Sequence, residues 1–243
     1  MKNYKTHLLI FLKSVLFTAA VITLAFSSYK LYSYNKEQDY NEKVAEKVVS
    51  ARLPEQTAPI SVNFKELKQE NNDIIAWIYC EGTPINYPVV QAEDNSYYLS
   101  RRIDGAYSAS GTLFADCLNK GDFTDNNTII YGHNMKNNTM FGTLVKYTNQ
   151  QYFDEHKQMY ILTPDRQYKV RLVAGATVNG TSPICKLPLE NEYKDTFVSE
   201  LIKKSTFKAD YMFSPDDKFV MLSTCSYSYD DARYVLIGVL QEI

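Results

Sequence analysis

The sequence has almost no excess of either charge, because 26 Lys and Arg residues stand against 28 Asp and Glu. Nucleic-acid binding by counterion release requires a clustered excess of Lys and Arg, so the composition predicts no nucleic-acid partner. Three enzyme signatures are absent as well: the G-x-S-x-G turn of serine hydrolases, the H-E-x-x-H metal site and a glycine-rich loop that holds phosphates. These absences leave chemistry based on another nucleophile to be considered.

Cysteine is also scarce, with Cys80, Cys117, Cys185 and Cys225 scattered along the chain. No two of them lie close enough in sequence to form a zinc-binding pair, so the sequence indicates no metal cofactor. An even number of cysteines in an oxidising compartment permits one or two disulfides, and bridges among the first three stay open. Those three each come after a short apolar run, which is typical of small buried side chains rather than reactive thiols.

An almost unbroken apolar run covers residues 8–26. A helix of about 20 apolar residues crosses the hydrocarbon core of a bilayer. The alternative is a cleaved signal peptide, because residues 25–27 resemble a small-residue cleavage site. Tyr29 and Tyr32 follow the run where a membrane interface would lie, which favours the uncleaved anchor. Residues 1–34 are therefore predicted to be an N-terminal tail and a membrane anchor. The lysines on the two sides of the run barely decide the orientation, and the tail is predicted to be cytoplasmic because the chemistry of the later residues favours a domain outside the cytoplasm.

A charged segment with prolines follows the anchor at 35–62. Its apolar residues recur at every fourth position from 40 to 48, a spacing typical of one face of a surface helix. This segment is predicted to be a helical stalk or linker. The compact domain is predicted to span 63–243, because the Asn-x-x-Glu pattern that starts at Asn63 resembles a capping box.

Short apolar runs separated by turn residues dominate the compact domain. They repeat at the close spacing of a barrel or sandwich, without the regular helices that βαβ units require. Twenty tyrosines and twelve phenylalanines also favour half-buried pleated surfaces. One stretch, 189–205, has apolar residues at helical spacing and is predicted to be a helix between two strands. The sequence therefore predicts a mainly β domain with strands at 74–79, 85–90, 111–114, 128–131, 159–162, 168–178, 218–222 and 233–240.

A thiol and a cation are predicted to lie side by side. The buried strand at 218–222 leads through Ser223 and Thr224 to Cys225, and the next strand begins at Arg233 after a short polar loop. If the two strands pair as a hairpin, Cys225 and Arg233 face each other at the loop end. Because a guanidinium keeps its charge at every relevant pH, it would stabilise both a thiolate and the negative oxygen that forms on an attacked carbonyl.

Histidine offers few candidates for proton transfer, with three in the chain. His7 precedes the apolar run, and His156 lies in a charged stretch typical of a solvated surface. His133 follows a short buried strand, and a histidine beside a cysteine can protonate the amine that leaves a cut peptide. Considered singly, Cys225 is equally compatible with a buried thiol, His133 with a structural residue and Arg233 with a surface charge. The spacing alone leaves a catalytic site and a non-catalytic, membrane-tethered β-domain as alternatives.

Several segments together resemble the signature sequences of sortases. Residues 222–225, with Arg233 eight positions after the cysteine, and residues 131–134 are similar to the cysteine and histidine motifs of that family. Segments 86–99 and 111–116 are similar to family landmarks before the histidine, so the resemblance covers most of the compact domain. The helical insertion before the cysteine strand and the helical N-terminal region resemble class B more than class A.

The resemblance implies a closed sortase-type β-barrel with peripheral helices, including a long helix before the cysteine-bearing strand. It implies an enzyme without a cofactor on the outer face of a Gram-positive cell membrane. The implied substrate is a secreted protein with a sorting motif near its C-terminus. The implied acceptor is an amine of a peptidoglycan precursor or, as in some relatives, a pilin lysine. Release of the product by water, which would make the enzyme a protease, stays open.

The resemblance also assigns roles to residues. Cys225 would attack the Thr carbonyl of the sorting motif and form a thioacyl-enzyme intermediate. His133 would carry protons to and from the two amines, and Arg233 would hold the carbonyl oxygen or its oxyanion. The neighbouring residues that would line the substrate groove are Tyr131, Ser223 and Thr224.

Overall fold

The structure is a computed structural model that describes residues 2–48, 57–182, 193–226 and 228–243. The chain forms two compact units, Met1–Val44 and Ala45–Ile243. Cys185 and the first residues of the helix predicted at 189–205 lie outside the described residues.

Helix α1 (Lys2–Val48) continues without a break through the predicted anchor and into the predicted stalk. Among the described residues, α1 alone contains a segment that is long and apolar enough to cross a membrane. Its large apolar side chains, such as Leu16, Phe17 and Leu24, are exposed. A helix with apolar side chains on all sides is typical of a membrane span or of the interior of a large protein.

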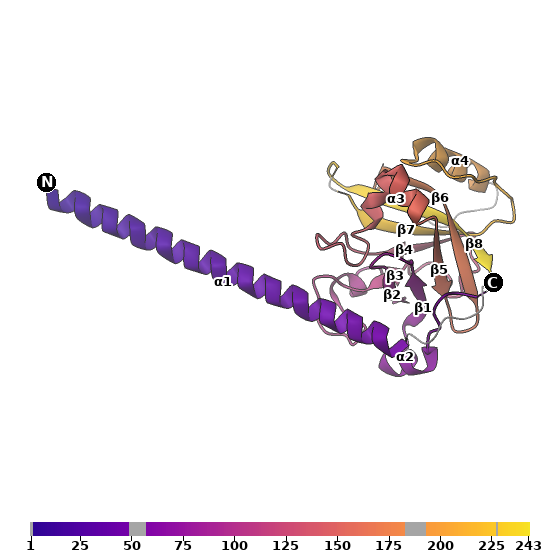
Figure 1. Ribbon diagram of the computed structural model, residues 1–243, viewed down its shortest axis with the longest axis horizontal. Helices are drawn as coiled ribbons and strands as arrows, with labels where there is room; N and C mark the ends of the chain where they lie inside the picture. The colour runs from indigo at the N-terminus through magenta and orange to yellow at the C-terminus, as the bar shows by residue number, and fades with distance from the viewer. Residues whose placement is uncertain (1, 49–56, 183–192, 227) are drawn as a thin grey trace. The chain divides into compact units, whose positions relative to one another are not determined.

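The described part of the second unit contains a closed barrel with the strand order β1-β2-β3-β4-β7-β8-β6-β5 (Figure 1). The mainly β barrel predicted from the sequence is confirmed, and each apolar run predicted as a strand overlaps one. The strands are β1 (Ile74–Tyr79), β2 (Asn86–Val90), β3 (Leu113–Ala115), β4 (Asn127–Tyr131), β5 (Gln158–Leu162), β6 (Gln167–Asn179), β7 (Phe219–Cys225) and β8 (Ala232–Glu242).

Short helices precede the first strand or connect later ones. They are α2 (Phe64–Glu70), η1 (Tyr97–Ser100), η2 (Leu144–Thr148), α3 (Gln150–Glu155) and α4 (Lys194–Lys204). The predicted helix start at Asn63 is confirmed, because Asn63 is the N-cap of α2 and its Oδ1 accepts a hydrogen bond from Glu66 N at 3.2 Å. The described part of the predicted 189–205 helix is α4, whose Val198 and Leu201 belong to the same buried cluster as apolar residues of β6, β7 and β8.

The position of β7 in the barrel determines which strand ends meet. β7 pairs with β4 in parallel and with β8 in antiparallel orientation. Parallel neighbours end at the same edge of a sheet, and an antiparallel neighbour begins there. The carboxyl ends of β4 and β7 and the start of β8 therefore lie together, which brings three distant segments of the chain to one place.

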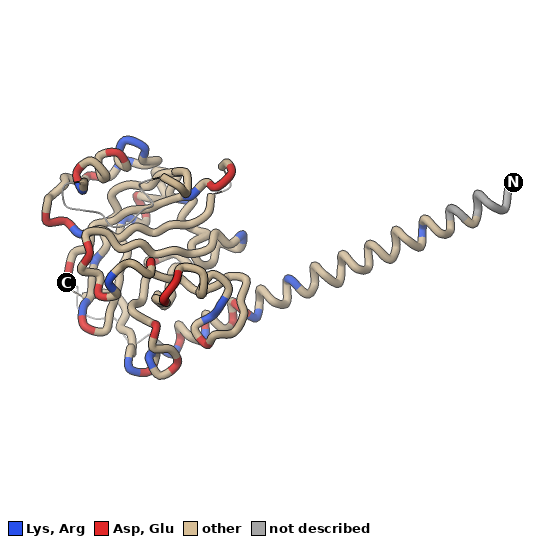
Figure 2. The backbone as a smooth tube through the Cα atoms, turned by 180° about the vertical axis from the view of Figure 1, so that it is seen from behind, with Lys and Arg blue, Asp and Glu red and all other residues tan. Residues whose placement is uncertain are grey.

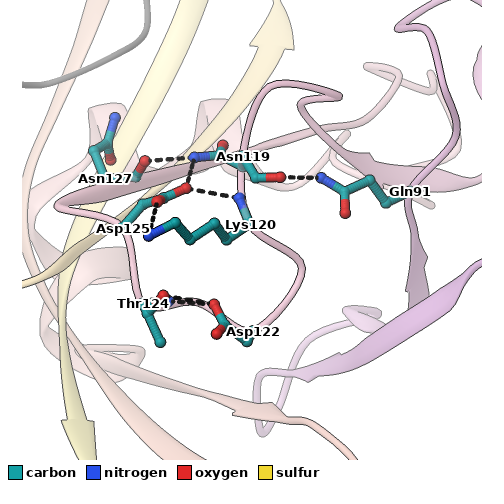
Figure 3. Close-up of polar contacts among 7 residues, drawn as sticks. All are labelled: Gln91, Asn119, Lys120, Asp122, Thr124, Asp125 and Asn127. Carbon is teal, nitrogen blue, oxygen red and sulfur yellow. Dashed lines mark hydrogen bonds and ion pairs between the residues drawn. The ribbon is translucent and has the colours of Figure 1, made fainter.

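A network of polar side chains holds the loop from β3 to β4 (Figure 3). Asn119 donates from Nδ2 to Asp125 Oδ2 at 2.8 Å and to the Asn127 carbonyl at 2.9 Å. Its Oδ1 accepts from Ile129 N at 2.9 Å, and its own carbonyl accepts from Gln91 at 2.7 Å. These bonds fix the beginning of β4, so the far end of that strand is held in a defined place.

The charged residues of the described barrel are mixed rather than separated by sign, as Figure 2 shows. Blue and red segments alternate around the second unit, whereas most of α1 carries neither colour. This mixture of signs agrees with the near-neutral composition of the chain.

Candidate active site

The end of β7 brings a thiol and a guanidinium together. Cys225 and Arg233 are direct partners in the β7–β8 register, as the hairpin prediction requires. Arg233 Nη1 donates to Cys225 Sγ at 2.9 Å. On its other side, Arg233 Nη2 lies 3.7 Å from Asp231 Oδ1. A permanent positive charge in contact with a sulfur stabilises negative charge that forms on or near that sulfur.

Cys225 is available for chemistry. Cys80, Cys117 and Cys225 are free thiols, and Cys185 lies outside the described residues. Cys225 therefore forms no disulfide with the other described cysteines, whereas a non-catalytic domain could have this thiol bridged. The peptide carbonyl of Cys225 accepts from Asn134 Nδ2 at 2.8 Å, so the segment after β4 also holds the backbone that carries the thiol.

His133 follows β4 by two residues and lies at the same edge of the barrel. Its Nε2 is 2.7 Å from the carbonyl oxygen of Leu99 in η1. A carbonyl oxygen only accepts hydrogen bonds, so Nε2 must be the protonated nitrogen in this contact. Nδ1 is then the nitrogen that exchanges a proton in the neutral ring.

A cavity of about 310 Å³ joins these groups. Cys225, His133 and Arg233 all line it, which is the convergence that the sequence predicted. The full set of lining residues is Asn95, Leu99, Phe114, Tyr131, Gly132, His133, Gly180, Ser223, Cys225 and Arg233. Two of the three predicted groove residues, Tyr131 and Ser223, are among them.

Thr224, the third predicted groove residue, does not line the cavity. Its side chain is 1% exposed, and its hydroxyl donates to the Gly132 carbonyl at 2.7 Å. Successive side chains of a strand point to opposite faces of the sheet. Because Ser223 and Cys225 face the cavity, Thr224 faces the other way and ties β7 to the segment that leads to His133.

A buried carboxylate orders one wall of the cavity. Asp116 Oδ2 accepts from Asn95 Nδ2 at 3.0 Å and from the Tyr131 hydroxyl at 2.8 Å. Its other oxygen accepts from Leu118 N at 2.9 Å, and Cys117 N donates to Asn95 Oδ1 at 2.8 Å. The amide of Asn95 is thereby fixed in one orientation, and the Tyr131 hydroxyl is directed toward Asp116.

Hydrogen bonds of the neighbouring residue Tyr98 hold the segment that carries Leu99. The buried Tyr98 donates its hydroxyl to Asp73 Oδ2 at 2.6 Å and accepts from Asn71 Nδ2 at 2.7 Å. Burial, followed by the hydrogen bond to Asp73, raises the pKa of the Tyr98 hydroxyl far above its ordinary value. Tyr98 therefore stays neutral and keeps η1 in place.

His156 is half-buried, whereas its charged neighbours had indicated a fully solvated residue. It caps the end of α3, with Nδ1 2.9 Å from the Tyr152 carbonyl and its ring stacked on the Tyr152 ring. His156 is not among the residues that line the cavity described above. Asn95, Leu99, Phe114 and Asp116 belong to segments that resemble the family, but the sequence assigned them no role in the site. Gly180 lies outside those segments and has no signal in the sequence.

No family model matches the chain. The sequence is 28% identical over 225 residues to sortase B of Listeria monocytogenes, which covers 88% of this chain and 91% of that protein. The fold matches sortase B from Bacillus anthracis in complex with AAEK1, with a TM-score of 0.76 and 30% identity over 88% of this chain and all of the other. It also matches a Staphylococcus aureus sortase B–substrate complex, with a TM-score of 0.76 and 26% identity over 87% and 99% of the two chains.

The barrel and these similarities define the chain as a cysteine transpeptidase. Its class follows from the particular relatives, all of which are class B enzymes and are matched over nearly their whole length. The chain belongs to the sortase family, class B.

Proposed function

We propose that Cys225 is the nucleophile of this transpeptidase, that His133 transfers protons and that Arg233 holds the oxyanion. The observation that carries the proposal is the 2.9 Å contact between Arg233 Nη1 and Cys225 Sγ, in a cavity that His133 also lines. A guanidinium in this position stabilises negative charge first on the sulfur and then on the attacked carbonyl oxygen.

The proposed reaction exchanges one amide bond for another. The ionised Cys225 sulfur adds to the Thr carbonyl carbon of the sorting motif, and the carbonyl oxygen takes the negative charge beside Arg233. When the C–N bond breaks, the leaving amine takes a proton from His133 and the acyl group stays on sulfur as a thioester. An incoming amine then adds to the thioester carbon, gives a proton to His133 and expels the sulfur as a thiolate.

The proposed acyl donor is a secreted protein with a sorting motif near its C-terminus. The S. aureus sortase B in the comparison was solved as a complex with its substrate, which supports a peptide in the corresponding cavity here. Tyr131 and Ser223 are proposed to contact that peptide, because both line the cavity. Thr224 is proposed to contribute indirectly, by holding the Gly132 carbonyl behind the wall.

The proposed acceptor is an amine of a peptidoglycan precursor, with a pilin lysine as the alternative. Residues 1–34 would anchor the enzyme in the membrane of a Gram-positive cell and residues 35–62 would act as a stalk. The domain at 63–243 would then work outside the cytoplasm. The apolar segment of α1 supports this arrangement, and removal of residues 1–34 should move the enzyme from the membrane fraction to the soluble fraction.

Trapping of the intermediate tests the proposed chemistry. The full chain is mixed with sorting-motif peptides, quenched in acid and analysed by intact-protein and peptide mass spectrometry. We expect an acyl adduct on Cys225 that hydroxylamine converts to a hydroxamate and that an added amine converts to a ligated peptide. An adduct on another residue, or product formation without any adduct, would contradict the proposal. The ratio of ligated to hydrolysed peptide separates transfer from proteolysis.

A further inference from the structure

The hydrogen bond between His133 and Leu99 determines which ring nitrogen takes part in proton transfer. The Leu99 carbonyl is 2.7 Å from Nε2 and cannot donate a proton, so the hydrogen lies on Nε2. The ring then gains and loses its proton at Nδ1, and it keeps the bond to Leu99 in both the neutral and the charged state. The position of a single peptide oxygen therefore matters for the proposed chemistry.

A neighbouring segment holds the carbonyls on both sides of Leu99. The Tyr98 carbonyl accepts from Thr112 N at 3.0 Å, and the Ser100 carbonyl accepts from Ser108 N at 3.0 Å. The Arg101 carbonyl accepts from the Thr112 hydroxyl at 2.8 Å. The carbonyls of residues 98, 100 and 101 are therefore bound to the segment 108–112. The carbonyl of Leu99, which lies between them, contacts His133 instead.

Gly111 lies against these carbonyls at a distance that only glycine allows. Its φ angle is +58°, a backbone conformation that other residues rarely adopt. A Cβ atom at this position would lie 2.5 Å from the Tyr98 oxygen and 2.7 Å from the Leu99 oxygen. Both neighbours are backbone atoms, and the second is the oxygen that contacts His133, so a Cβ atom at this position would require the backbone at Leu99 to move.

We propose that Gly111 and Thr112 are positioning residues that aim the Leu99 carbonyl at His133 and thereby keep the ring in its Nε2–H form. The proposal rests on the function proposed for His133, since it explains why Nδ1 is the nitrogen that exchanges protons with the two amines. Neither residue is among those that line the cavity. They act on the His133 ring only through the carbonyl oxygen of Leu99.

Gly105 is a matched control for Gly111. It also has a positive φ angle, +78°, but a Cβ atom there would meet nothing within 4 Å. Gly105→Ala and Gly111→Ala therefore carry a similar backbone strain, and only Gly111→Ala displaces the Leu99 peptide. A difference between the two variants reports the displaced carbonyl rather than the general cost of replacing a glycine.

Long-range ¹H–¹⁵N NMR of the histidine rings measures the tautomer directly. The full chain in detergent micelles, at about pH 9 where an ordinary imidazole is neutral, contains three histidines. A His156→Gln variant identifies the resonances of His156. We expect His133 to be in the Nε2–H form in the wild type and in Gly105→Ala, and to be a mixture of tautomers in Gly111→Ala. With sorting-motif peptides, kcat of Gly111→Ala should fall by about 10- to 100-fold with KM changed less than about twofold, since misplacement by about 1 Å costs up to roughly that factor.

Thr112 provides a milder variant if Gly111→Ala does not fold. Thr112→Val has nearly the same shape but loses the hydroxyl that holds the Arg101 carbonyl, whereas Thr112→Ser keeps it. We expect Thr112→Val to shift the tautomer partly and to lower kcat by a few-fold, and Thr112→Ser to restore both. A pure Nε2–H ring in both Gly111→Ala and Thr112→Val, or an equal shift in Gly105→Ala, would overturn the positioning role.

The tautomer measurement requires no substrate, so it is independent of the proposed function. Full transpeptidase activity in His133→Gln would overturn the role of His133 in proton transfer. The same result would leave the measured link between Gly111, the Leu99 carbonyl and the ring unchanged. The two proposals therefore fail in different experiments.

Discussion

Two cysteines that lie at strand ends have opposite surroundings. Cys80 directly follows β1, is 1% exposed and has its sulfur 3.6 Å from the Gln158 carbonyl. Burial raises the pKa of the Cys80 thiol above its ordinary value. Cys225 ends β7, lines the cavity and has a guanidinium 2.9 Å from its sulfur. The comparison teaches that access and a neighbouring charge, rather than the thiol itself, distinguish a reactive cysteine from a packing one.

The largest expected effect separates the two thiols by substitution. Cys225→Ala should abolish transpeptidation of sorting-motif peptides, because no other described cysteine lines the cavity. Cys80→Ala should keep kcat within about twofold of the wild type, since its sulfur takes no part in the proposed reaction. Both variants are assayed by chromatography of the ligated peptide, with circular dichroism as the control for folding. Comparable loss of activity in the two variants would remove the distinction between these thiols.

The next effect concerns the charge beside Cys225. Arg233→Lys keeps a positive charge but loses the planar fork of donors, so kcat should fall by about 10²-fold, and Arg233→Gln should cost about 10³-fold. Arg166→Lys is the matched control, because Arg166 pairs with Glu242 at the surface, away from the cavity. Steady-state kinetics measures all three. An Arg233→Lys enzyme with wild-type kcat would show that a point charge is enough.

A smaller effect is expected from the carboxylate behind Arg233. Asp231 has a positive φ of 55° and lies 3.7 Å from Arg233 Nη2. Asn tolerates that backbone conformation, so Asp231→Asn removes the charge without adding strain. Because the pair is largely exposed, kcat/KM should change by only about two- to fivefold. The exposed neighbour Asp230 supplies the control, and an equal change in Asp230→Asn would assign the effect to general electrostatics.

The smallest effect is on stability and concerns Cys80. In the unfolded chain this thiol ionises near the ordinary pKa of about 8.5, whereas burial raises the pKa in the folded protein. The folded state therefore loses stability relative to the unfolded state as the pH rises through the interval between those two values. Below that interval the thiol is protonated in both states, and the folded protein keeps its full stability. Urea unfolding from about pH 7 to pH 10 should show a steeper loss for the wild type than for Cys80→Ala, and parallel curves would contradict it.

The sequence was sufficient to predict the contact between Cys225 and Arg233. A buried strand, a short polar loop and a second strand define a hairpin, and the length of the loop sets the register. His133 could be selected because the chain has few histidines and one of them follows a buried strand. The assignment of Thr224 to the cavity failed, although the alternation of side chains along β7 would have corrected it once Cys225 was placed there.

Other parts of the site depend on long-range packing and have no local signal. The parallel pairing of β4 with β7 joins segments that are far apart in sequence, and neither strand pattern identifies its partner. The Leu99 carbonyl is a backbone group, which no residue type reveals. Asp116 could be noted as part of a motif, but its two hydrogen bonds to Asn95 and Tyr131 require the folded wall.

The strand order also has a consequence for the timing of folding. β7 and β8 are inserted between β4 and β6, so a nascent chain that ends before residue 219 has a gap in its sheet and two unpaired strand edges. Such a chain already contains the histidine but neither the sulfur nor the guanidinium. Because the two strands that complete the cylinder also carry Cys225 and Arg233, a fragment of this length cannot form the proposed thioester.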